Sequence, residues 1–443
     1  METVLLYILG ILIVVVGLAL SIGLHEIGHL LPAKLFGVKV GQYMIGFGPT
    51  VWSRRFGETE YGLKAIPMGG YISMAGMYPP AKDGSAAART SSTGFFQTLV
   101  QDARSASAET VTVGQEERVF YKLPVWKRIV IMLGGPTMNL LIGIVLYAVL
   151  LMGFGASQVS TTVGSVSECV KAETSSSQEC SADDPVAPGA AAGLLPGDRL
   201  VSLGGTAVTS WAQATGLIRD AAGDDLVMVV ERDGEKVTLT AVPLLTERYV
   251  YDDNGEVVTD SAGESVTEKV GFLGIGPALE TVQQPVTAVL PAVGDNIGRV
   301  AHMILNLPER LVDVVNAAFG PEERDPNGPI SVVGVGRLAG EISSLDTIPI
   351  ADKASGLVGL LASLNIALFV FNLVPLMPLD GGHVAGALWE GIRRFFAKLF
   401  GRRDPGPVDI AKLVPLTLVV VVLLGSMSAL LIYADLVKPI SIL

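Results

Sequence analysis

Four long apolar runs constrain this chain more than any other feature of its sequence. They cover residues 4–24, 129–154, 354–379 and 413–434, and none of them contains Asp, Glu, Lys or Arg. Each is long enough to cross a hydrocarbon core of about 30 Å as a helix. The first run lacks a basic segment before it and a small-residue cleavage site, so we expect a retained span and not a signal peptide. The sequence therefore predicts a polytopic α-helical membrane protein with four transmembrane helices.

The charge distribution orients these helices. The formal net charge is −12, but residues 157–353 hold 29 acidic and 12 basic residues, a net of −17, which leaves +5 for the rest of the chain. The loops that follow the first and third runs carry most of the remaining Lys and Arg. The positive-inside rule places these loops in the cytoplasm and the acidic block outside. A block this acidic excludes nucleic acid as a partner.

Both cysteines, Cys169 and Cys180, lie in the acidic block. Disulfides persist outside the cytoplasm and not within it. The sequence leaves a disulfide between the two and a pair of free thiols as equal alternatives.

The segments between the runs differ in composition. Residues 31–78 alternate aromatic and β-branched residues with glycine, which predicts a β-hairpin or small sheet at the membrane surface. Residues 79–120 are rich in Ser and Ala and predict a flexible cytoplasmic insertion. Strand-like pieces in 158–250, with an Asp-Gly turn at 233–234, predict a small β-rich domain of α+β type. The full division is 1–30, 31–78, 79–120, 121–157, 158–250, 251–353, 354–380, 381–411 and 412–435.

Two of these segments combine apolar and polar residues in helical patterns. Within 251–353, residues 251–283 match no pattern, whereas 284–319 predict an amphipathic helix outside the membrane. Residues 381–411 follow the third run and contain "ALWEGIRRFFAKLFGRR". This basic amphipathic segment is typical of a helix that lies at the membrane interface.

Three titratable residues stand at the end of the first run, in "HEIGH". His25 and His29 are four residues apart, so both imidazoles lie on one face of a helix and can bind one metal ion. Glu26 follows His25 and can take a proton from a metal-bound water. The alternative is an inert, hydrogen-bonded set, but each titratable group in hydrocarbon costs about 2.5–3.5 kcal/mol. The pattern therefore indicates a catalytic Zn²⁺ site with Glu26 as the base.

A third metal ligand is expected at the end of the third run, in "NLVPLMPLDGGH". The first and third spans run in the same direction, so Asp380 comes to the same membrane face as the two histidines. By itself Asp380 reads as a helix-terminal aspartate before a Gly-Gly turn. His383 is a second candidate, but His₂-carboxylate is the known ligand set that Asp380 completes. Pro375 and Pro378 predict a break in the helix that opens a water-accessible pocket.

Two asparagines lie within the predicted spans. Asn372 precedes Asp380 by eight residues, and Asn139 lies in "GGPTMN" in the second span, where Gly134 and Gly135 allow close approach of backbones. Each side chain fits either an interhelical hydrogen bond or a contact with substrate.

The motifs together resemble the site-2 proteases, a family of intramembrane zinc metalloproteases. The likeness is to the bacterial, sigma-E-regulating type with four spans and an extracytoplasmic PDZ domain, and actinobacterial members are most similar. The matching stretches are "HEIGH", "IGFGPTVWSRRFGETEYGLKAIPMGGYISMAG", "GGPTMN", "APGAAAGLLPGDRLVSLGGTAV", "GPISVVGVGR" and "NLVPLMPLDGGH". They touch most of the chain apart from residues 79–118.

The resemblance implies a role for each motif residue. His25, His29 and Asp380 would bind Zn²⁺, and Glu26 would be the catalytic base. Substrate would contact Asn372, Asn139, Gly69 and Gly70, with an edge strand from residues 38–74 pairing its backbone. One PDZ unit is evident in place of the two that the sigma-E type carries.

The resemblance also implies partners and a location. The substrates would be single-pass membrane proteins such as anti-sigma factors, first trimmed by another protease. The protein would lie in the plasma membrane of a bacterium, with its active site near the cytoplasmic face. The alternatives are a catalytically inactive membrane-anchored PDZ scaffold and a metal transporter. A scaffold would have lost Glu26 or a ligand, and a transporter needs polar residues in both halves of the bilayer, which the first and fourth runs do not supply.

Overall fold

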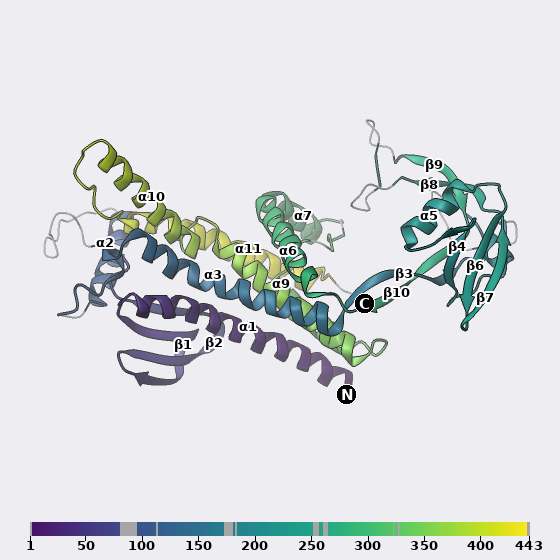
Figure 1. Cartoon of the computed structure of the whole chain (residues 1–443). Helices are drawn as coiled ribbons and strands as arrows, with labels where there is room; N and C mark the ends of the chain where they lie inside the picture. Colours follow the sequence, from purple (N-terminus) through teal and green to yellow (C-terminus); the bar gives the residue numbers. More distant parts are fainter. Residues whose placement is uncertain are drawn as a thin grey trace. The chain divides into compact units, whose positions relative to one another are not determined.

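The computed structural model describes residues 2–79, 95–111, 114–171, 180–181, 184–250, 257–259, 265–321, 323–326 and 328–440. The chain forms two compact units, which we describe separately. The first contains Met1–Phe154 and Gln284–Leu443, and the second contains Gly155–Gln283. Figure 1 shows helices dominating the first unit and strands dominating the second.

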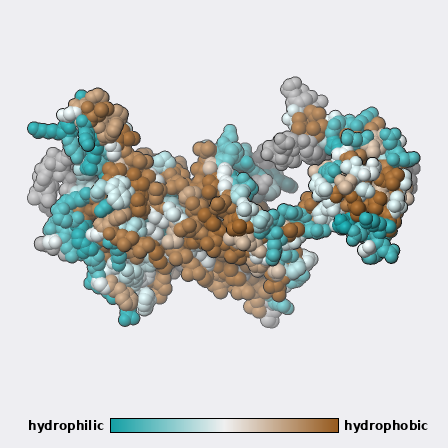
Figure 2. Space-filling model, in the orientation of Figure 1, coloured by the Kyte–Doolittle hydropathy of each residue, from teal (hydrophilic) through white to brown (hydrophobic). Residues whose placement is uncertain are grey.

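The first unit contains four helices, among the described residues, that are long and apolar enough to cross a membrane. They are α1 (Glu2–Leu35), α3 (Val125–Ala148) with its π-helical continuation η2 (Val149–Phe154), α9 (Ile350–Asn372), and η4 (Ile410–Leu413) leading into α11 (Val414–Val437). Figure 2 shows the apolar surface that they expose. The four spans predicted from the sequence are confirmed as apolar helices.

Helices α1, α3 and α9 pack closely through small residues. A Cβ on Gly28 would lie 2.2 Å from the carbonyl oxygen of Gly134, so α1 and α3 touch backbone to backbone there. Leu361 of α9 lies against Gly17 of α1. Four residues later on both helices, the Asn365 side chain of α9 donates a hydrogen bond to Ser21 of α1. Contacts advance in step along both helices, so α1 and α9 run in the same direction, as the sequence predicted (Figure 1).

The third span ends earlier than the sequence predicted. Helix α9 stops at Asn372, and Asp380 is the first residue of the next helix, α10 (Asp380–Leu399), and not the last residue of the span. The reason is the pair Pro375 and Pro378, which lack backbone N–H groups and prevent the helix from continuing. The basic amphipathic helix expected after the span is α10 itself.

The predicted β region is present and packs against α1. Strands β1 (Val40–Phe56) and β2 (Thr59–Met74) form one two-stranded sheet that folds over itself. The segment 42–45 of β1 pairs with residues 70–73 on one side and with residues 60–63 on the other. The Tyr43 hydroxyl donates a hydrogen bond to the carbonyl of Gly23, which fastens β1 to α1.

The prediction that residues 79–120 form a flexible insertion is wrong for the residues that the structure describes. Residues Phe95–Glu109 form helix α2, and the 3-10 helix η1 (Phe120–Lys122) follows it. Arg104 of α2 forms an ion pair with Asp409, and Ser107 accepts a hydrogen bond from the backbone N–H of Tyr78. Long-range contacts therefore order a sequence that is weakly apolar by itself. Residues 80–94 and 112–113 lie outside the described residues.

Three shorter helices complete the first unit. The amphipathic helix expected at 284–319 is divided at Asn306 into α6 (Val289–Leu305) and α7 (Leu307–Phe319), preceded by η3 (Val286–Ala288). Helix α8 (Val332–Ser344) packs on α1, where a Cβ on Gly10 would collide with the carbonyl of Ala339. Buried Asp435 of α11 forms an ion pair with Arg324 and accepts a hydrogen bond from the backbone N–H of Ser331. These contacts hold the start of α8 against α11.

The second unit is a β-rich domain that extends beyond the predicted residues 158–250. Its six-stranded sheet has the order β10-β3-β4-β6-β7, with β5 beside β4, and β8 and β9 form a separate pair. The unassigned residues 251–283 contribute β9 and β10, because β10 pairs with β3 across more than a hundred residues of sequence. The elements are β3 (Ala156–Val166), α4 (Pro188–Ala191), β4 (Arg199–Leu203), β5 (Thr206–Ala207), α5 (Trp211–Asp220), β6 (Leu226–Arg232), β7 (Glu235–Ala241), β8 (Leu244–Tyr249), β9 (Thr267–Phe272) and β10 (Ile275–Val282).

Two local features of this unit answer expectations from the sequence: the state of the two cysteines and the Asp-Gly turn. Cys169 and Cys180 form a disulfide, which decides between the two alternatives. The turn between β6 and β7 has positive φ at both Asp233 and Gly234, and strand pairing runs from Arg232 to Glu235. The predicted Asp-Gly hairpin is thus confirmed.

Candidate active site

Three polar side chains from two distant segments converge in the first unit. His25 and His29 extend from α1, one turn apart, and Asp380 extends from the start of α10. The two imidazole Nε2 atoms are 3.2 Å apart, and each lies 3.3 Å from Oδ2 of Asp380. The structure thus brings together the three residues that the sequence predicted as a ligand set.

These distances match the spacing of ligands around one zinc ion. Zinc–nitrogen and zinc–oxygen bonds of about 2.0–2.1 Å in a tetrahedron put neighbouring ligand atoms about 3.3 Å apart. The three atoms form a group of possible metal ligands whose members lie within 4.8 Å of one another. The buried Oδ2 of Asp380 has no conventional hydrogen-bond donor among the described residues. A divalent cation would satisfy it, so the donor set fits Zn²⁺.

The backbone of α3 fixes the tautomer of His29. Nδ1 of His29 lies 2.7 Å from the carbonyl oxygen of Ile131. A carbonyl only accepts, so Nδ1 donates and the neutral ring keeps its lone pair on Nε2, which faces Asp380. Metal-bound histidines are held in this way by a second partner. Ile131 was not predicted as a site residue, because a backbone acceptor leaves no side-chain signal in the sequence.

Gly135 forms the wall of the site on α3. A Cβ at this position would lie 2.2 Å from Nε2 of His29 and 2.6 Å from Nε2 of His25. Only glycine therefore leaves room for the two imidazoles beside this helix. The sequence identified the Gly-Gly pair as a place of close approach between backbones, but not as a boundary of the metal site.

Glu26 occupies the position expected of a catalytic base. It follows His25 on α1 and is buried, and it interacts electrostatically with His29, His25 and Asp380. The β2 backbone passes directly beside it, since a Cβ on Gly70 would lie 3.0 Å from its Cγ. Gly69 adopts a φ of 100° next to the ring of Phe47, a conformation that suits glycine.

The two predicted asparagines lie in different surroundings. Asn139 is buried, and its amide nitrogen is 3.1 Å from Nδ1 of His25. Asn139 thus contacts the His25 ring on the side away from Asp380 and is not itself one of the three candidate metal ligands. Asn372 donates to the carbonyl of Leu368 within α9. The structure therefore gives Asn139 the interhelical contact that the sequence offered as one alternative, and Asn372 an intrahelical one.

His383 is not part of the ligand group found among the described residues. It lies one turn after Asp380 on α10, and burial lowers the pKa of its imidazole to about 4. Gly381 and Gly382 precede it and press against the connection from α9, where added Cβ atoms would lie 2.4 Å from the carbonyl of Val374 and 2.7 Å from the amide of Met377. This packing sets the first turn of α10 and so the position of Asp380.

A buried ion pair holds the rest of α10 against α3. Arg128 of α3 forms an ion pair with Glu390, and both side chains are buried. Glu390 also pairs with Arg394 and accepts a hydrogen bond from the backbone of Val408. Sequence analysis did not detect this pair, because its members are 262 residues apart.

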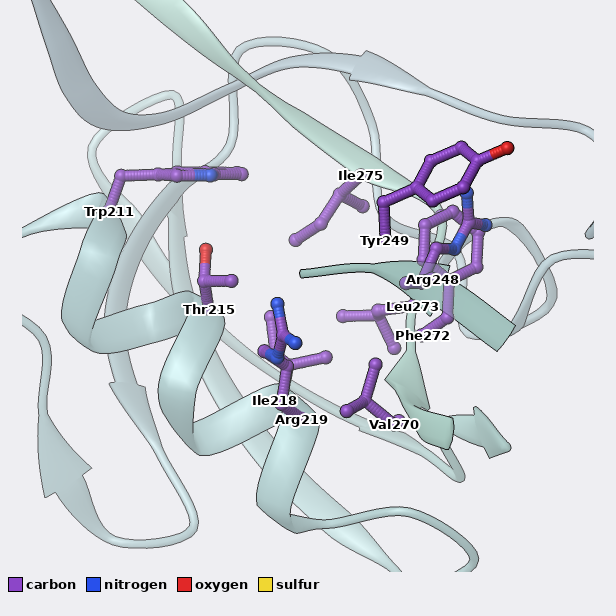
Figure 3. A pocket seen from close by; sticks show the side chains of 12 residues that line it. Trp211, Thr215, Ile218, Arg219, Arg248, Tyr249, Val270, Phe272, Leu273 and Ile275 are labelled. Carbon is purple, nitrogen blue, oxygen red and sulfur yellow. The ribbon is translucent and has the colours of Figure 1, made fainter. Parts of the chain in front are cut away.

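The second unit contains a cavity of about 260 Å³. Helix α5 supplies one wall, strand β8 supplies another, and the turn from β9 to β10 closes the floor (Figure 3). Arg248 lies over the ring of Phe272, and Arg219 pairs with Glu268 beside the opening.

Comparison with known proteins agrees with this site. The model of peptidase family M50 matches residues 13–402. The zinc metalloprotease Rip1 of Mycobacterium tuberculosis is 33% identical over 447 residues, which cover 98% of this chain and 99% of the relative. Rip1 of Mycolicibacterium smegmatis is 32% identical over 98% of each chain, and the metalloprotease MmpA of Caulobacter vibrioides is 30% identical over 87% of this chain and 88% of the relative. This chain therefore belongs to peptidase family M50, the site-2 proteases, and is a membrane zinc metalloendopeptidase.

Proposed function

We propose that the chain hydrolyses peptide bonds within or near the transmembrane segments of single-pass membrane proteins. The observation that carries this proposal is the meeting of His25 and His29, on the apolar helix α1, with Asp380 at the start of α10, and with Glu26 beside them. A soluble peptidase would have no use for a ligand set placed on membrane-spanning helices. In this proposal the site is reached by a substrate that lies in the bilayer or at its surface.

Each site residue has a distinct task in this proposal. His25, His29 and Asp380 would hold Zn²⁺, which would lower the pKa of a bound water to about 7. Glu26 takes the proton from the attacking water and passes it to the amine that leaves. Burial of Glu26 keeps bulk water from competing for that proton. Ile131 holds His29 in the tautomer that offers Nε2 to the metal.

Asn139 does the same for His25 in this proposal. If the side-chain amide of Asn139 is flipped by 180°, its oxygen and nitrogen exchange places in the same space. Oδ1 of Asn139, which has no partner among the described residues, then lies next to Nδ1 of His25. Nδ1 then donates, and Nε2 keeps its lone pair for the metal. A contact of Asn139 with substrate, and likewise of Asn372, remains part of the proposal.

The β region presents substrate to the site. A helix in a bilayer hides its own amides, so it must unwind before hydrolysis, and the freed groups need partners. Residues 70–73 form the edge of the sheet nearest Glu26, since they pair with segment 42–45 on one side only. An extended substrate added along this edge would pass Gly69 and Gly70 and reach the metal site.

The sidedness follows from charge. Lys and Arg in the loops after α1 and α9 put those loops, the β region and the catalytic site near the cytoplasmic face of a bacterial plasma membrane. The β-rich unit is then an extracytoplasmic PDZ-like domain. Its cavity would take the newly made C-terminus of a substrate trimmed by another protease, with Arg219 or Arg248 near the carboxylate (Figure 3). The substrates in this proposal include anti-sigma factors.

The test compares wild type with Glu26→Gln in detergent, because glutamine leaves all three ligands in place. We expect both proteins to bind about one zinc ion per chain, as the ligand set requires, and only wild type to cleave a panel of single-pass substrates. The second candidate, an inactive PDZ scaffold, is less favoured because Glu26 and all three ligands are present. Absence of zinc from both proteins, or equal cleavage by both, would contradict the proposal.

A further inference from the structure

The β region touches the catalytic helix within a single turn of α1. The Tyr43 hydroxyl donates a hydrogen bond of 2.7 Å to the carbonyl oxygen of Gly23, and Tyr43 is 8% exposed. Ile45 reaches the same place, since a Cβ on Gly23 would lie 2.8 Å from its Cδ1. A Cβ on Gly70 would lie 3.0 Å from Cγ of Glu26, which follows within the same turn. The contact with β1 and the contact between β2 and the catalytic base are therefore neighbours on the helix.

The strand segment that carries Tyr43 also carries the proposed substrate edge. Residues 42–45 pair with residues 70–73, and Tyr43 lies opposite Ile72. Backbone hydrogen bonds hold neighbouring strands about 4.8 Å apart, so a segment and its partner move together. A shift of Tyr43 relative to α1 therefore shifts the 70–73 edge relative to Glu26 by a similar amount.

The far end of the β region is attached to α1 separately. Leu30 of α1 joins Val40 of β1 in a buried apolar cluster. Lys34 donates a hydrogen bond to the Tyr61 hydroxyl at the same end. These contacts follow the catalytic base along the helix, and they would keep the sheet on α1 if the hydroxyl of Tyr43 were absent. The Tyr43 hydroxyl thus fixes the end of the sheet that lies beside the site.

This hydroxyl fixes position and adds little to stability. Burial, assisted by the charge of Glu26, raises the pKa of Tyr43 to about 12, so the hydroxyl remains a donor at neutral pH. Within a regular helix the Gly23 carbonyl also accepts from the N–H four residues later. Loss of the hydroxyl would therefore leave no buried polar group without a partner, which is the costly outcome. The sheet would lose a point of attachment, and the chain would keep its fold.

We propose that Tyr43 is a positioning residue that holds the 70–73 edge at a fixed distance and register from Glu26, and that this selects the peptide bond that is cut. Tyr43 acts through the sheet and not on the metal, so zinc affinity is independent of it. This inference rests on the proposed function, in which the edge presents substrate to the site. Its structural part, the attachment of the edge beside Glu26, is independent of any substrate.

The first experiment measures which bonds are cut. The full chain is incubated with one single-pass membrane substrate, and the products are identified by mass spectrometry. Tyr43→Phe is the test variant, and Tyr61→Phe is the matched control, because it removes the same hydroxyl from the same sheet at the far end. Tyr43→Phe should cut neighbouring bonds as well, and kcat at the original bond should fall about fivefold, the net value of one hydrogen bond. KM and zinc content should not change.

A second variant probes the same attachment from its apolar side. Ile45→Val removes only Cδ1, the atom that lies against Gly23. It should also broaden the set of bonds that are cut, and it replaces Tyr43→Phe if that variant does not fold. A smaller folded fraction would lower turnover without changing the distribution of products, so the distribution distinguishes positioning from stability.

The attachment is also measured without substrate. A Cβ on Gly70 would lie 3.1 Å from Cγ2 of Ile22, so the cysteines of Ile22→Cys/Gly70→Cys are within reach of a disulfide. An added diazene oxidant accepts the two electrons and two protons that the thiols lose as the sulfurs join. The link should form severalfold faster with Tyr43 present than in the Tyr43→Phe background, and the Tyr61→Phe background should match wild type.

Three outcomes overturn the inference: unchanged products in Tyr43→Phe and Ile45→Val, an equal effect of Tyr61→Phe, or equal rates of cross-linking with and without the Tyr43 hydroxyl. Zinc binding by wild type without cleavage of any substrate would instead count against the proposed function. Cross-linking would then still decide whether Tyr43 holds the edge beside Glu26.

Discussion

Gly135→Ala should destroy the metal site while leaving the helix that carries it intact. The added Cβ would lie 2.2 Å from Nε2 of His29 and 2.6 Å from Nε2 of His25. Ordinary contacts of a Cβ begin at 3.4 Å, so the His29 ring must retreat by about 1.2 Å, whereas metal–ligand distances tolerate only about 0.2 Å. One imidazole can no longer face Asp380.

The expected loss of zinc affinity is at least about 100-fold, or about 2.7 kcal/mol. Removing a residue that hydrogen-bonds a metal ligand costs about 10–100-fold, so the expected loss lies at or above the upper end of that range. Helix stability moves in the opposite direction, since alanine is favoured over glycine in a helix interior by about 1 kcal/mol. The substitution therefore separates a failure of the site from a failure of folding.

The assay is competition for zinc between the purified chain and a chromophoric chelator at fixed pH. Gly153→Ala is the matched control, because nothing lies within 4 Å of the Cβ that it would add. The control should bind zinc as wild type does. Without metal, Gly135→Ala should still unfold cooperatively, because the helix preference for alanine offsets part of the overpacking cost of about 1–3 kcal/mol. Zinc affinity within about threefold of wild type, a difference of only about 0.7 kcal/mol, would refute the placement of Gly135 against the imidazoles.

Substitutions at three further sites test other contacts. Asn139→Leu should lower zinc affinity by about 10–100-fold by releasing His25, and Asn139→Asp should restore much of it; equal affinity in all three proteins would mean that Asn139 does not orient the ring. Glu390→Gln leaves Arg128 buried beside a neutral group and should cost about 3–5 kcal/mol in unfolding by denaturant, with Glu280→Gln, on exposed β10, as a control that costs little. The Arg232 guanidinium bound to Asp198 holds the pKa of that carboxyl below its usual range, so its contribution is present above about pH 4 and is lost as the pH falls through the folded pKa. Asp198→Asn should therefore lower the melting temperature of the β-rich unit at neutral pH and have less effect in acid, and an equal effect at both pH values would count against the pair.

Local patterns predicted much of the fold and most of the site. The four apolar runs, the β region, the hairpin turn at Asp233 and the helical spacing of His25 and His29 each depend on residues close together in the sequence. The break that Pro375 and Pro378 predicted is present, but the span was drawn to residue 380 because apolar composition continues past Asn372, where α9 ends. Helix α2 was missed because its order comes from Arg104 and Ser107, whose partners lie 305 and 29 residues away.

The sequence by itself determined that this chain has four helices apolar enough to cross a membrane, and that His25, Glu26 and His29 lie at metal-site spacing in the first of them. Hydrophobicity and helical period are properties of neighbouring residues, so they need no knowledge of the fold. Only the tertiary structure decided that Asp380 starts a new helix, that Ile131 and Asn139 contact the imidazoles from outside, that Gly135 leaves them room, and that β10 closes the sheet beside β3. Those features arise where helices and strands distant in sequence come into van der Waals contact, and a residue pattern carries no record of which backbone will lie opposite it.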